Sequence, residues 1–589
     1  MRLRRPVANL LLLGLLLLTL GLTPRPAAAT SALLDPALVS RLATAPPATP
    51  ISVIVTYAAP PSATDLARFD ALGVVYAPLN RLPMAGALAT PAQINQIAQL
   101  PGVVSIYLNQ SLHYFLHESV PLIGATTVWQ DYGLTGAGVG VAVIDTGIDA
   151  THADLRLHQT TKQNVKVLGL QAAAGQNLYG LNLPVLYLND VPNTDTTGGH
   201  GTHVSGIIAA SGGASGGYYK GVAPGADLIG LGVGEGIDIY TAVAGFNWVL
   251  QHRQEYNIRV VNCSWGNIVP GFDPHDPVNV ATKQLHDAGI TVVFAAGNSG
   301  ANTNTLNTYS VAPWVIGVAA GEKDGHTVAF FSSRGIPGDS FYHPTLTAPG
   351  YLIASDRTAT GAFVNGGSTA TDAAFIAPQY LPYYTVASGT SMAAPHVAGT
   401  VALIVQANPS LTPDVIKRVL VNTARPIPGA QEYAAGAGYL DALAAVQTAR
   451  SIRNIRTYHD PRTGREEQVY DLVDTWTGTV GLSAPGIAGS DSRQVVVQPG
   501  TESLEVAIDW NLAGTGQTGV VSDLNLYLYD PSGQLAASSE VVQTIYNYAN
   551  ETVHVDLPVA GTWTATVTGF LNAPQDYSGT SSAVVLVNP

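Results

Sequence analysis

A serine at the start of an apolar helix is the feature that most constrains how this chain can fold. Residues 389–396 read Gly-Thr-Ser-Met-Ala-Ala-Pro-His, which places Ser391 at the opening turn of a predicted helix. Residues 397–405 are apolar on nearly every side, and such a helix is buried in the core of a large fold. We place Pro395 in the first turn, where no backbone N–H is needed. The sequence therefore predicts a hydroxyl beside the positive end of a buried helix dipole.

Two further blocks supply a base and a carboxylate, which a serine needs to become a useful nucleophile. His200 lies in the block 199–206, ahead of a run of small residues. Asp145 ends the apolar run 140–144, which is typical of a parallel strand buried on both faces. Open α/β sheets bind ligands at the carboxyl ends of such strands. The chain order Asp, His, Ser therefore predicts a catalytic triad.

These three blocks resemble those of the subtilases, the subtilisin-like serine proteases, over roughly residues 120–450. The order of the three residues is the subtilisin order. The resemblance implies an α/β fold of three layers with a mainly parallel sheet. It also implies peptide hydrolysis through an acyl-enzyme, with Ser391 as nucleophile, His200 as general base and Asp145 orienting the imidazole.

A fourth block completes the predicted chemistry. Residues 291–296 form another apolar run, followed by Gly297, Asn298, Ser299 and Gly300. In subtilases the asparagine of this block donates its side-chain amide to the oxyanion, so the resemblance gives Asn298 that role. The backbone N–H of Ser391 would be the second donor.

The resemblance also suggests how a substrate peptide is held. An extended peptide would pair with backbone on both of its sides, and pockets would select its side chains. The candidate substrate-binding residues are Ser264, Trp265, Gly266, Gly232, Gly234 and Gly297. Packing alone is the alternative for Trp265.

Other polar residues in these blocks are given structural roles. We interpret Asp149 and Asp154 as turn residues, and His203 and His396 as packed, hydrogen-bonded histidines. A zinc site is not expected at His200 and His203, because the pair has no Glu between its members. An aspartic protease is excluded because a second Asp-Thr-Gly block is absent from the sequence.

The N-terminus has the pattern of a secretory signal at residues 1–29. A basic start precedes the apolar run 10–22, and Ala27 to Ala29 match a cleavage site. This predicts a secreted, extracellular protein with no membrane contact once the signal is removed. The net charge of −14 disfavours nucleic acid as a partner. Cys263 is the only cysteine, so no internal disulfide can form, and we interpret it as an apolar filler.

Residues 30–117 are predicted to be a propeptide. After the Pro-rich linker 45–50, the patterns follow the order βαββαβ of a ferredoxin-like α+β unit, with elements at 51–57, 63–72, 74–79, 84–88, 91–100 and 103–108. The unit resembles the inhibitor-type propeptide of subtilases. This implies a zymogen that cuts itself between Asn109 and Ser119, with residues 104–116 in the cleft. A small domain retained in the mature enzyme is the alternative.

Two segments of the predicted catalytic domain, residues 118–450, depart from the family. The loop 210–224 is rich in Gly and Ser and lacks Asn and Asp, so the calcium site of many bacterial relatives is not expected there. Structural calcium elsewhere is compatible with the sequence. The segment 358–384 is longer than usual, and we favour a plain surface loop over a lid.

The composition changes after residue 450. Residues 451–467 are charged and contain Pro and Gly, which predicts a linker. Residues 468–589 contain alternating runs separated by turns, which predicts an all-β sandwich. This region resembles the pre-peptidase or P-domain-like modules of secreted bacterial proteases. For Asp523 and Asp530 we favour turns over calcium ligands.

Together these features predict a secreted serine endopeptidase, made as a self-processing zymogen and acting as a monomer on protein or peptide substrates. Its own propeptide would be an intramolecular inhibitor, and the chemistry would need no cofactor. Two alternatives are a catalytically silent subtilase fold used for binding or adhesion, and an esterase, since the same acyl-enzyme chemistry cleaves esters.

Overall fold

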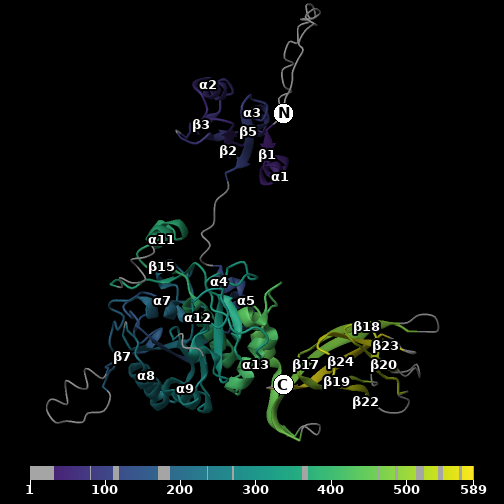
Figure 1. Ribbon diagram of the computed structural model, residues 1–589. Coiled ribbons are helices and arrows are strands. Elements are labelled where there is room, and N and C mark those ends of the chain that lie inside the picture. Colours follow the sequence, from purple (N-terminus) through teal and green to yellow (C-terminus); the bar gives the residue numbers. More distant parts are fainter. Residues whose placement is uncertain are drawn as a thin grey trace, which may run out of the picture. The chain divides into compact units, whose positions relative to one another are not determined.

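The computed structural model describes most of the chain outside the predicted signal, residues 1–29. The described residues are 32–79, 81–109, 118–169, 186–234, 236–267, 271–360, 369–459, 464–483, 489–511, 523–541, 548–569 and 574–587. Contacts divide the chain into two compact units, Met1–His113 and Tyr114–Pro589 (Figure 1). Within the described ranges, no helix has both the length and the apolarity needed to cross a membrane.

The described part of the first unit, residues 32–79 and 81–109, is a single sheet with three helices. Its elements are β1 (Leu33–Leu34), α1 (Pro36–Thr44), β2 (Ile51–Tyr57), α2 (Ala63–Ala71), β3 (Val75–Pro78), β4 (Met84–Ala89), α3 (Pro91–Ile97) and β5 (Val103–Leu108). The spatial order is β1-β5-β2-β4-β3, and the last four strands are antiparallel neighbours. This confirms the predicted ferredoxin-like pattern from β2 to β5.

The segment 45–50 does not separate this unit from what precedes it. Strand β1 pairs parallel with β5, and Leu38 of α1 is fully buried in the core of the unit. The predicted linker is therefore an internal connection between α1 and β2. Local sequence could not show this, because a two-residue strand leaves no periodicity.

The second unit is built around an eight-stranded sheet. In spatial order its strands are β13 (Leu346–Pro349), β12 (Val315–Gly321), β11 (Thr291–Ala295), β10 (Ile258–Cys263), β6 (Gly140–Asp145), β9 (Asp227–Gly232), β7 (Thr161–Val167) and β8 (Tyr187–Leu188). All neighbours are parallel except β7 and β8. Every residue of β6 and β11 is buried, as expected for strands covered on both faces.

Helices cover both faces of this sheet (Figure 1). On one face lie α7 (His200–Ala209), α12 (Thr390–Ala407), α13 (Pro413–Thr423) and α15 (Ala442–Ser451), and on the other α8 (Ile239–His252) and α9 (Pro277–Asp287). Each face of the sheet has its own hydrophobic core, and β6 contributes to both. Val141 and Val143 lie in the core with α7 and α12, and Ala142 and Ile144 lie in the core with α8 and α9. The result is the predicted three-layer α/β arrangement.

The order of the strands reverses beside β6. After β6 the chain builds β7 and β9 on one side of it, and then crosses to place β10 on the other side. Ligands of open α/β sheets bind at such a switch point, outside the carboxyl ends of the strands. We therefore expect the functional site at the carboxyl ends of β6 and β10.

Shorter elements surround this core. They are α4 (Ser119–Leu122), α5 (Ala125–Tyr132), η1 (Gly213–Ser215), η2 (Thr308–Val311), β14 (Ile353–Asp356), α11 (Thr369–Phe375), η3 (Pro378–Tyr380), β15 (Tyr384–Ala387) and α14 (Glu432–Ala435). The segment 358–384 differs from the plain loop that we favoured. Thr358 and Tyr384 at its two ends are fully buried, and β15 pairs with β14.

The C-terminal part is all-β. One antiparallel sheet contains β16 (Ile452–His459), β17 (Glu466–Val480), β24 (Gln575–Leu586), β19 (Thr501–Asn511) and β22 (Tyr548–Asp556), and the other contains β18 (Ser490–Val497), β23 (Gly561–Gly569), β20 (Leu524–Tyr529) and β21 (Leu535–Ser539). Leu504 and Ile508 of the first sheet and Leu526 of the second share one core. Asp530 accepts backbone N–H groups of Ser532 and Gln534, as a turn residue does.

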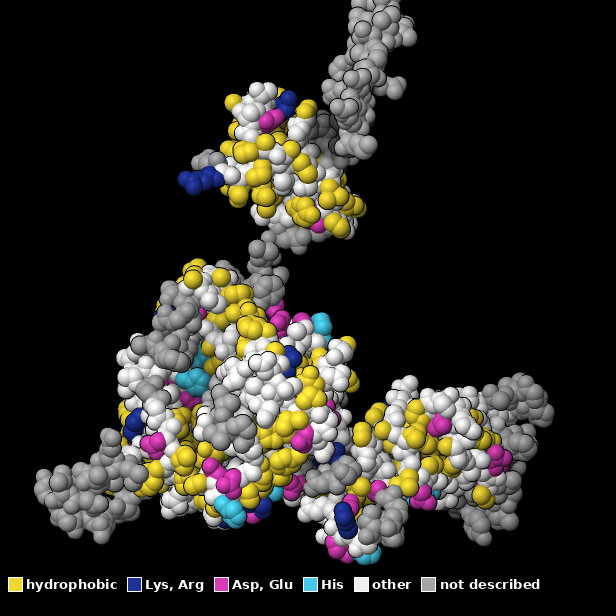
Figure 2. Space-filling view, viewed as in Figure 1, with side chains coloured by type: hydrophobic (Ala, Val, Ile, Leu, Met, Phe, Trp, Pro, Cys, Tyr) yellow, Lys and Arg dark blue, Asp and Glu magenta, His cyan; other side chains and the backbone are white. Residues whose placement is uncertain are grey.

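The linker prediction for residues 451–467 is wrong over most of its length. Residues 452–459 form β16, an edge strand paired with β17. Its charged side chains suggested a linker, but charges on an exposed edge strand also protect a sheet against pairing with other chains. Figure 2 shows that charged side chains are otherwise sparse on the visible surface, in line with their 11% share of the sequence.

Candidate active site

A carboxylate and an imidazole meet at the end of β6. His200 Nδ1 lies 2.7 Å from Asp145 Oδ1, which also accepts the N–H of Thr146 at 2.8 Å. A carboxylate oxygen only accepts, so Nδ1 carries the proton and the basic lone pair of the ring is on Nε2. Asp145 is buried, while 21% of the His200 side chain is exposed. The buried partner thus fixes the tautomer of a ring that solvent and substrate can reach.

The helix that carries His200 begins at that residue and is capped from a distance. Its N-cap, Gly199, has no side chain to accept the free N–H groups of the first turn. The side chain of Asp195 supplies the missing cap. Its Oδ1 accepts a hydrogen bond from the N–H of Gly199, and its Oδ2 accepts hydrogen bonds from the N–H and the hydroxyl of Thr202. Burial raises the pKa of Asp195 despite these bonds. Sequence reasoning missed this residue, although an acidic group just before a helix was a usable signal.

Ser391 is the second residue of α12, as predicted, but the assignment of Pro395 to the first turn is wrong. Pro395 is the sixth helical residue, so it cannot donate to the carbonyl of Ser391, four residues earlier. Ser264 takes over that function. Its hydroxyl donates to the Ser391 carbonyl at 2.9 Å, and the Ser391 hydroxyl donates to the Ser264 carbonyl at 2.9 Å.

Ser264 links α12 to the switch point of the sheet. It directly follows β10, and Trp265 Nε1 donates to the carbonyl of Ile144, the residue before Asp145, at 2.7 Å. Strands β6 and β10 are hydrogen-bonded neighbours, and helices α7 and α12 pack together. The predicted triad residues therefore lie at one edge of the sheet: Asp145 at the end of β6, and His200 and Ser391 at the starts of the adjoining helices α7 and α12.

The side-chain nitrogen of Asn298 and the backbone nitrogen of Ser391 lie close to one position, that of Gly389. The Oδ1 of Asn298 accepts the N–H and the hydroxyl of Thr390, at 2.8 and 3.0 Å, which leaves its Nδ2 to donate. A Cβ built on Gly389 would lie 3.2 Å from that Nδ2 and 3.6 Å from the backbone N of Ser391. The two predicted oxyanion donors therefore lie near one another, and Thr390, which sequence reasoning did not single out, orients the side chain of Asn298.

Three of the six predicted substrate-binding residues contact the residues of the site. Ser264 contacts Ser391, the N–H of Gly297 donates to the Thr390 hydroxyl, and Gly232 pairs with Asp145 across β6 and β9. Trp265 mainly packs: its ring contacts the aromatic rings of Phe246, Phe294 and Tyr309.

Two glycines of this set have different constraints. A Cβ on Gly266 would lie 2.1 Å from the Asn307 side chain, so the backbone there requires glycine. Gly234 has a φ of +102° with open space around it. The positive φ, rather than crowding, is what favours glycine at that position.

The remaining polar residues of the blocks are packed. His203 Nε2 lies 3.1 Å from the carbonyl of Thr385, and His396 Nδ1 lies 2.8 Å from that of Met392. Burial lowers the pKa of His203 to about 3 and that of His396 to about 4, so both rings are neutral near pH 7. Burial and the charge of Asp145 raise the pKa of the Cys263 thiol. These residues are structural, as predicted.

Comparisons with known proteins identify the family. The model of the subtilase family matches residues 136–456. Serine protease AprX of Bacillus subtilis (strain 168) is 32% identical over 360 residues, 58% of this chain and 74% of AprX. Subtilisin BL and Subtilisin Savinase, both of Lederbergia lenta, are each 33% identical over 54% of this chain and 93% of their own length. The chain belongs to the subtilase family and is a subtilisin-like serine endopeptidase.

Proposed function

We propose that this endopeptidase is secreted, is made as a self-processing zymogen, and cleaves proteins through the triad Asp145, His200 and Ser391. The observation that carries the proposal is the 2.7 Å Asp145–His200 pair, together with a serine at the start of α12 that is hydrogen-bonded to Ser264 at the end of the adjoining strand β10. A buried carboxylate that fixes the tautomer of a partly exposed histidine is the arrangement that general-base catalysis requires.

The residues suggest the following sequence of steps. Ser391 Oγ attacks the peptide carbonyl while His200 Nε2 accepts its proton, and Asp145 stabilises the imidazolium. Asn298 Nδ2 and the N–H of Ser391 stabilise the oxyanion. His200 then protonates the leaving amine, and water hydrolyses the acyl-enzyme by the same route. No step needs a cofactor, and structural calcium remains a proposal for sites other than the loop 210–224.

We further propose that residues 30–117 are an intramolecular inhibitor released by self-cleavage. Support comes from the ferredoxin-like unit ahead of the protease domain and from the use of propeptide inhibitors by subtilases. The predicted cut between Asn109 and Ser119 falls largely on residues 110–117, outside the described ranges. Protein and peptide substrates, a monomeric state and removal of a signal at 1–29 belong to the same proposal.

Replacing the nucleophile tests the proposal. In Ser391→Ala we expect an unprocessed precursor, no casein or ester hydrolysis, and no labelling by a phosphonylating reagent. Ser410 is exposed, so Ser410→Ala is the matched control and should behave as wild type. This comparison should hold both with and without EGTA, which removes calcium from the assay. Normal processing of Ser391→Ala would refute self-cleavage. Ester turnover without casein cleavage by wild type would favour the esterase, and an unlabelled wild type the silent binder.

A further inference from the structure

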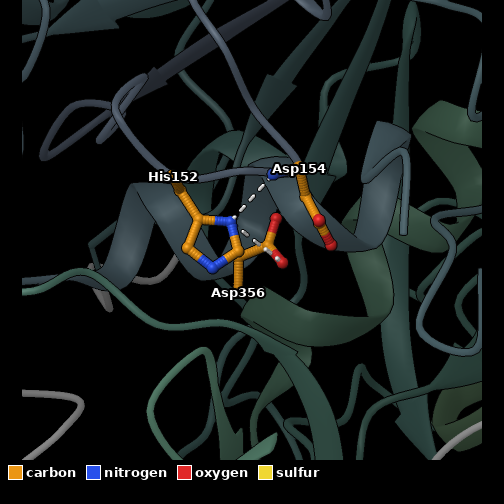
Figure 3. A group of neighbouring side chains, drawn as sticks. All are labelled: His152, Asp154 and Asp356. Atoms are coloured by element: carbon orange, nitrogen blue, oxygen red, sulfur yellow. Dashed lines mark hydrogen bonds and ion pairs between the residues drawn. The ribbon is translucent and has the colours of Figure 1, made fainter. Parts of the chain in front are cut away.

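Three buried side chains lie together behind the helix of His200. His152 and Asp154 follow β6 in the chain, and Asp356 ends β14 (Figure 3). Each offers one ligand atom, and these atoms lie within 4.8 Å of one another. His152 is 8% exposed and both aspartates are fully buried. The cluster has no part in the mechanism proposed above.

Asp356 is the member that the protein does not satisfy. Among the described residues, neither of its carboxylate oxygens has a hydrogen-bond partner. His152 is the neighbouring group that could become positively charged, and its Nδ1 lies 3.6 Å from Asp356 Oδ1. The neighbouring Arg357 pairs with a different carboxylate, that of Asp372. A buried carboxylate without a partner is costly, and either a bound cation or a proton on the carboxyl would remove that cost.

The other two side chains are oriented as metal ligands usually are. His152 Nε2 lies 3.0 Å from the Tyr383 carbonyl, which can only accept, so the lone pair of the ring is on Nδ1, on the side of Asp356. Metal-binding histidines are commonly held by such a bond from their other nitrogen. Asp154 is held in a similar way: Oδ1 accepts the N–H of Ala214, and Oδ2 accepts the hydroxyl of Tyr384. Each oxygen keeps a further lone pair.

We propose that His152 Nδ1, Asp154 and Asp356 bind one divalent transition-metal ion of the Zn²⁺ class. One imidazole and two carboxylates form a mixed nitrogen and oxygen set, which suits Zn²⁺ better than Ca²⁺, an ion that takes oxygen ligands. The 3.6 Å between Nδ1 and Oδ1 fits two ligands that are each ~2.0–2.2 Å from one ion. On binding the ion, Nδ1 gives up the 3.2 Å hydrogen bond that it accepts from the N–H of Asp154.

The position of the site gives the ion a structural role. Asp356 lies against Gly206 of α7, where an added Cβ would be 2.8 Å from Asp356 Oδ2. His152 and Asp154 belong to the loop that leaves Asp145. A bound ion therefore joins this loop to β14, which packs against the back of the His200 helix, and it stabilises the fold without entering the reaction.

The test measures metal binding and stability rather than activity. The full-length Ser391→Ala protein, stripped with chelator, is titrated with Zn²⁺ by calorimetry, and its melting temperature is followed with Zn²⁺ and with Ca²⁺. We expect one Zn²⁺ per chain, a higher melting temperature with Zn²⁺ than with Ca²⁺, and binding weakened more than ~100-fold in Asp356→Asn. Removing a residue that only holds a ligand in place lowers metal affinity by about 10–100-fold, so a larger loss would mark Asp356 as a ligand itself.

The matched control is Asp190→Asn, which alters another His–Asp pair, the exposed His158–Asp190 pair. It should bind Zn²⁺ like the parent. Because Asp356→Asn could fail to fold, His152→Gln is a second variant and should lose the same binding step. Absence of a saturable site in the parent, or equal affinity in the folded variants, would overturn the proposal. A proton shared by Asp154 and Asp356 would then balance the charge.

Discussion

At the scale of single residues, the hydroxyl of Ser264 compensates for a hydrogen bond that Pro395 cannot make in the serine helix. Pro395 removes the N–H that would satisfy the carbonyl of Ser391, and the hydroxyl of Ser264 supplies a donor instead. Asn262 Nδ2 in turn donates to that hydroxyl at 3.0 Å. The backbone of the nucleophile is thus held by the end of β10 as well as by its own helix.

This compensation predicts coupled effects on stability. In the Ser391→Ala background, Ser264→Ala should lower the free energy of unfolding by about 1–3 kcal/mol, because a part-buried carbonyl loses its donor. Adding Pro395→Ala restores an N–H four residues after that carbonyl, so Ser264→Ala should then cost less. Urea unfolding of the four proteins measures the coupling. An equal cost of Ser264→Ala in both backgrounds would show that the two residues do not compensate.

The side chain of Asn298 allows a kinetic prediction. Its Oδ1 is occupied by Thr390, so its Nδ2 is oriented before substrate arrives. Asn298→Ala should lower kcat by ~10²–10³ with little change in KM, because the bond forms to the oxyanion rather than to the ground state. The exposed Asn302→Ala, four residues away, is the control. A fall of less than about threefold in kcat would remove Asn298 from the oxyanion site.

At the scale of elements, helix α7 is held at its start and along its back. Asp195 caps its first turn, and Gly206 lets it approach β14 closely. A Cβ on Gly206 would meet the Ser355 hydroxyl at 2.2 Å. The glycine is therefore explained by the close approach of a strand rather than by a positive φ.

Two helical glycines make a matched pair. Gly206→Ala should destabilise the protein by about 1–3 kcal/mol through overpacking against β14. Gly245→Ala in α8 meets its nearest atom at 3.4 Å and should stabilise by about 0.5–1 kcal/mol, because alanine is the better helix former. Thermal or urea unfolding in the Ser391→Ala background compares them. Effects of the same sign would contradict the packing argument.

The sequence predicted the strands better than the connections. Runs such as 140–144 and 291–295 are apolar throughout because both faces are covered, and that pattern is visible locally. The segments 451–467 and 358–384 were misjudged. Their strands and packing depend on partners distant in the chain: β17 for the first, and Asp154, which accepts the hydroxyl of Tyr384, for the second.

At the scale of the whole molecule, buried neutral histidines tie stability to pH. The pKa of His203 is lowered to about 3 and that of His396 to about 4, against 6.5 for an ordinary histidine. Between pH 6.5 and about 4 the unfolded chain binds both protons and the folded protein binds neither. The free energy of unfolding should therefore fall as the pH falls through this window.

The contribution of each ring is up to about 1.4 kcal/mol per pH unit. We expect His396→Gln, in the Ser391→Ala precursor, to change how the free energy of unfolding depends on pH between pH 6 and 4.5. The slope should fall by nearly the amount that one bound proton contributes. Buried Asp195 and Asp372, whose pKa values are raised by burial, act in the opposite direction but equally in both proteins. Urea unfolding across this range measures the slopes, and identical slopes would show that His396 is protonated in the folded state.

The sequence by itself determined the fold class and the positions of the triad candidates. Apolar runs that end in Asp145 and in the Gly297–Asn298 block, and a helix that starts at Ser391, are local signals, because periodicity and chain breaks depend on near neighbours. Only the tertiary structure decided which groups satisfy one another. Ser264 and Ser391, and Asp195 and the first turn of α7, are pairings that arise from folding. The physical reason is that buried polar groups need partners, and the fold, not the spacing of the residues, chooses them.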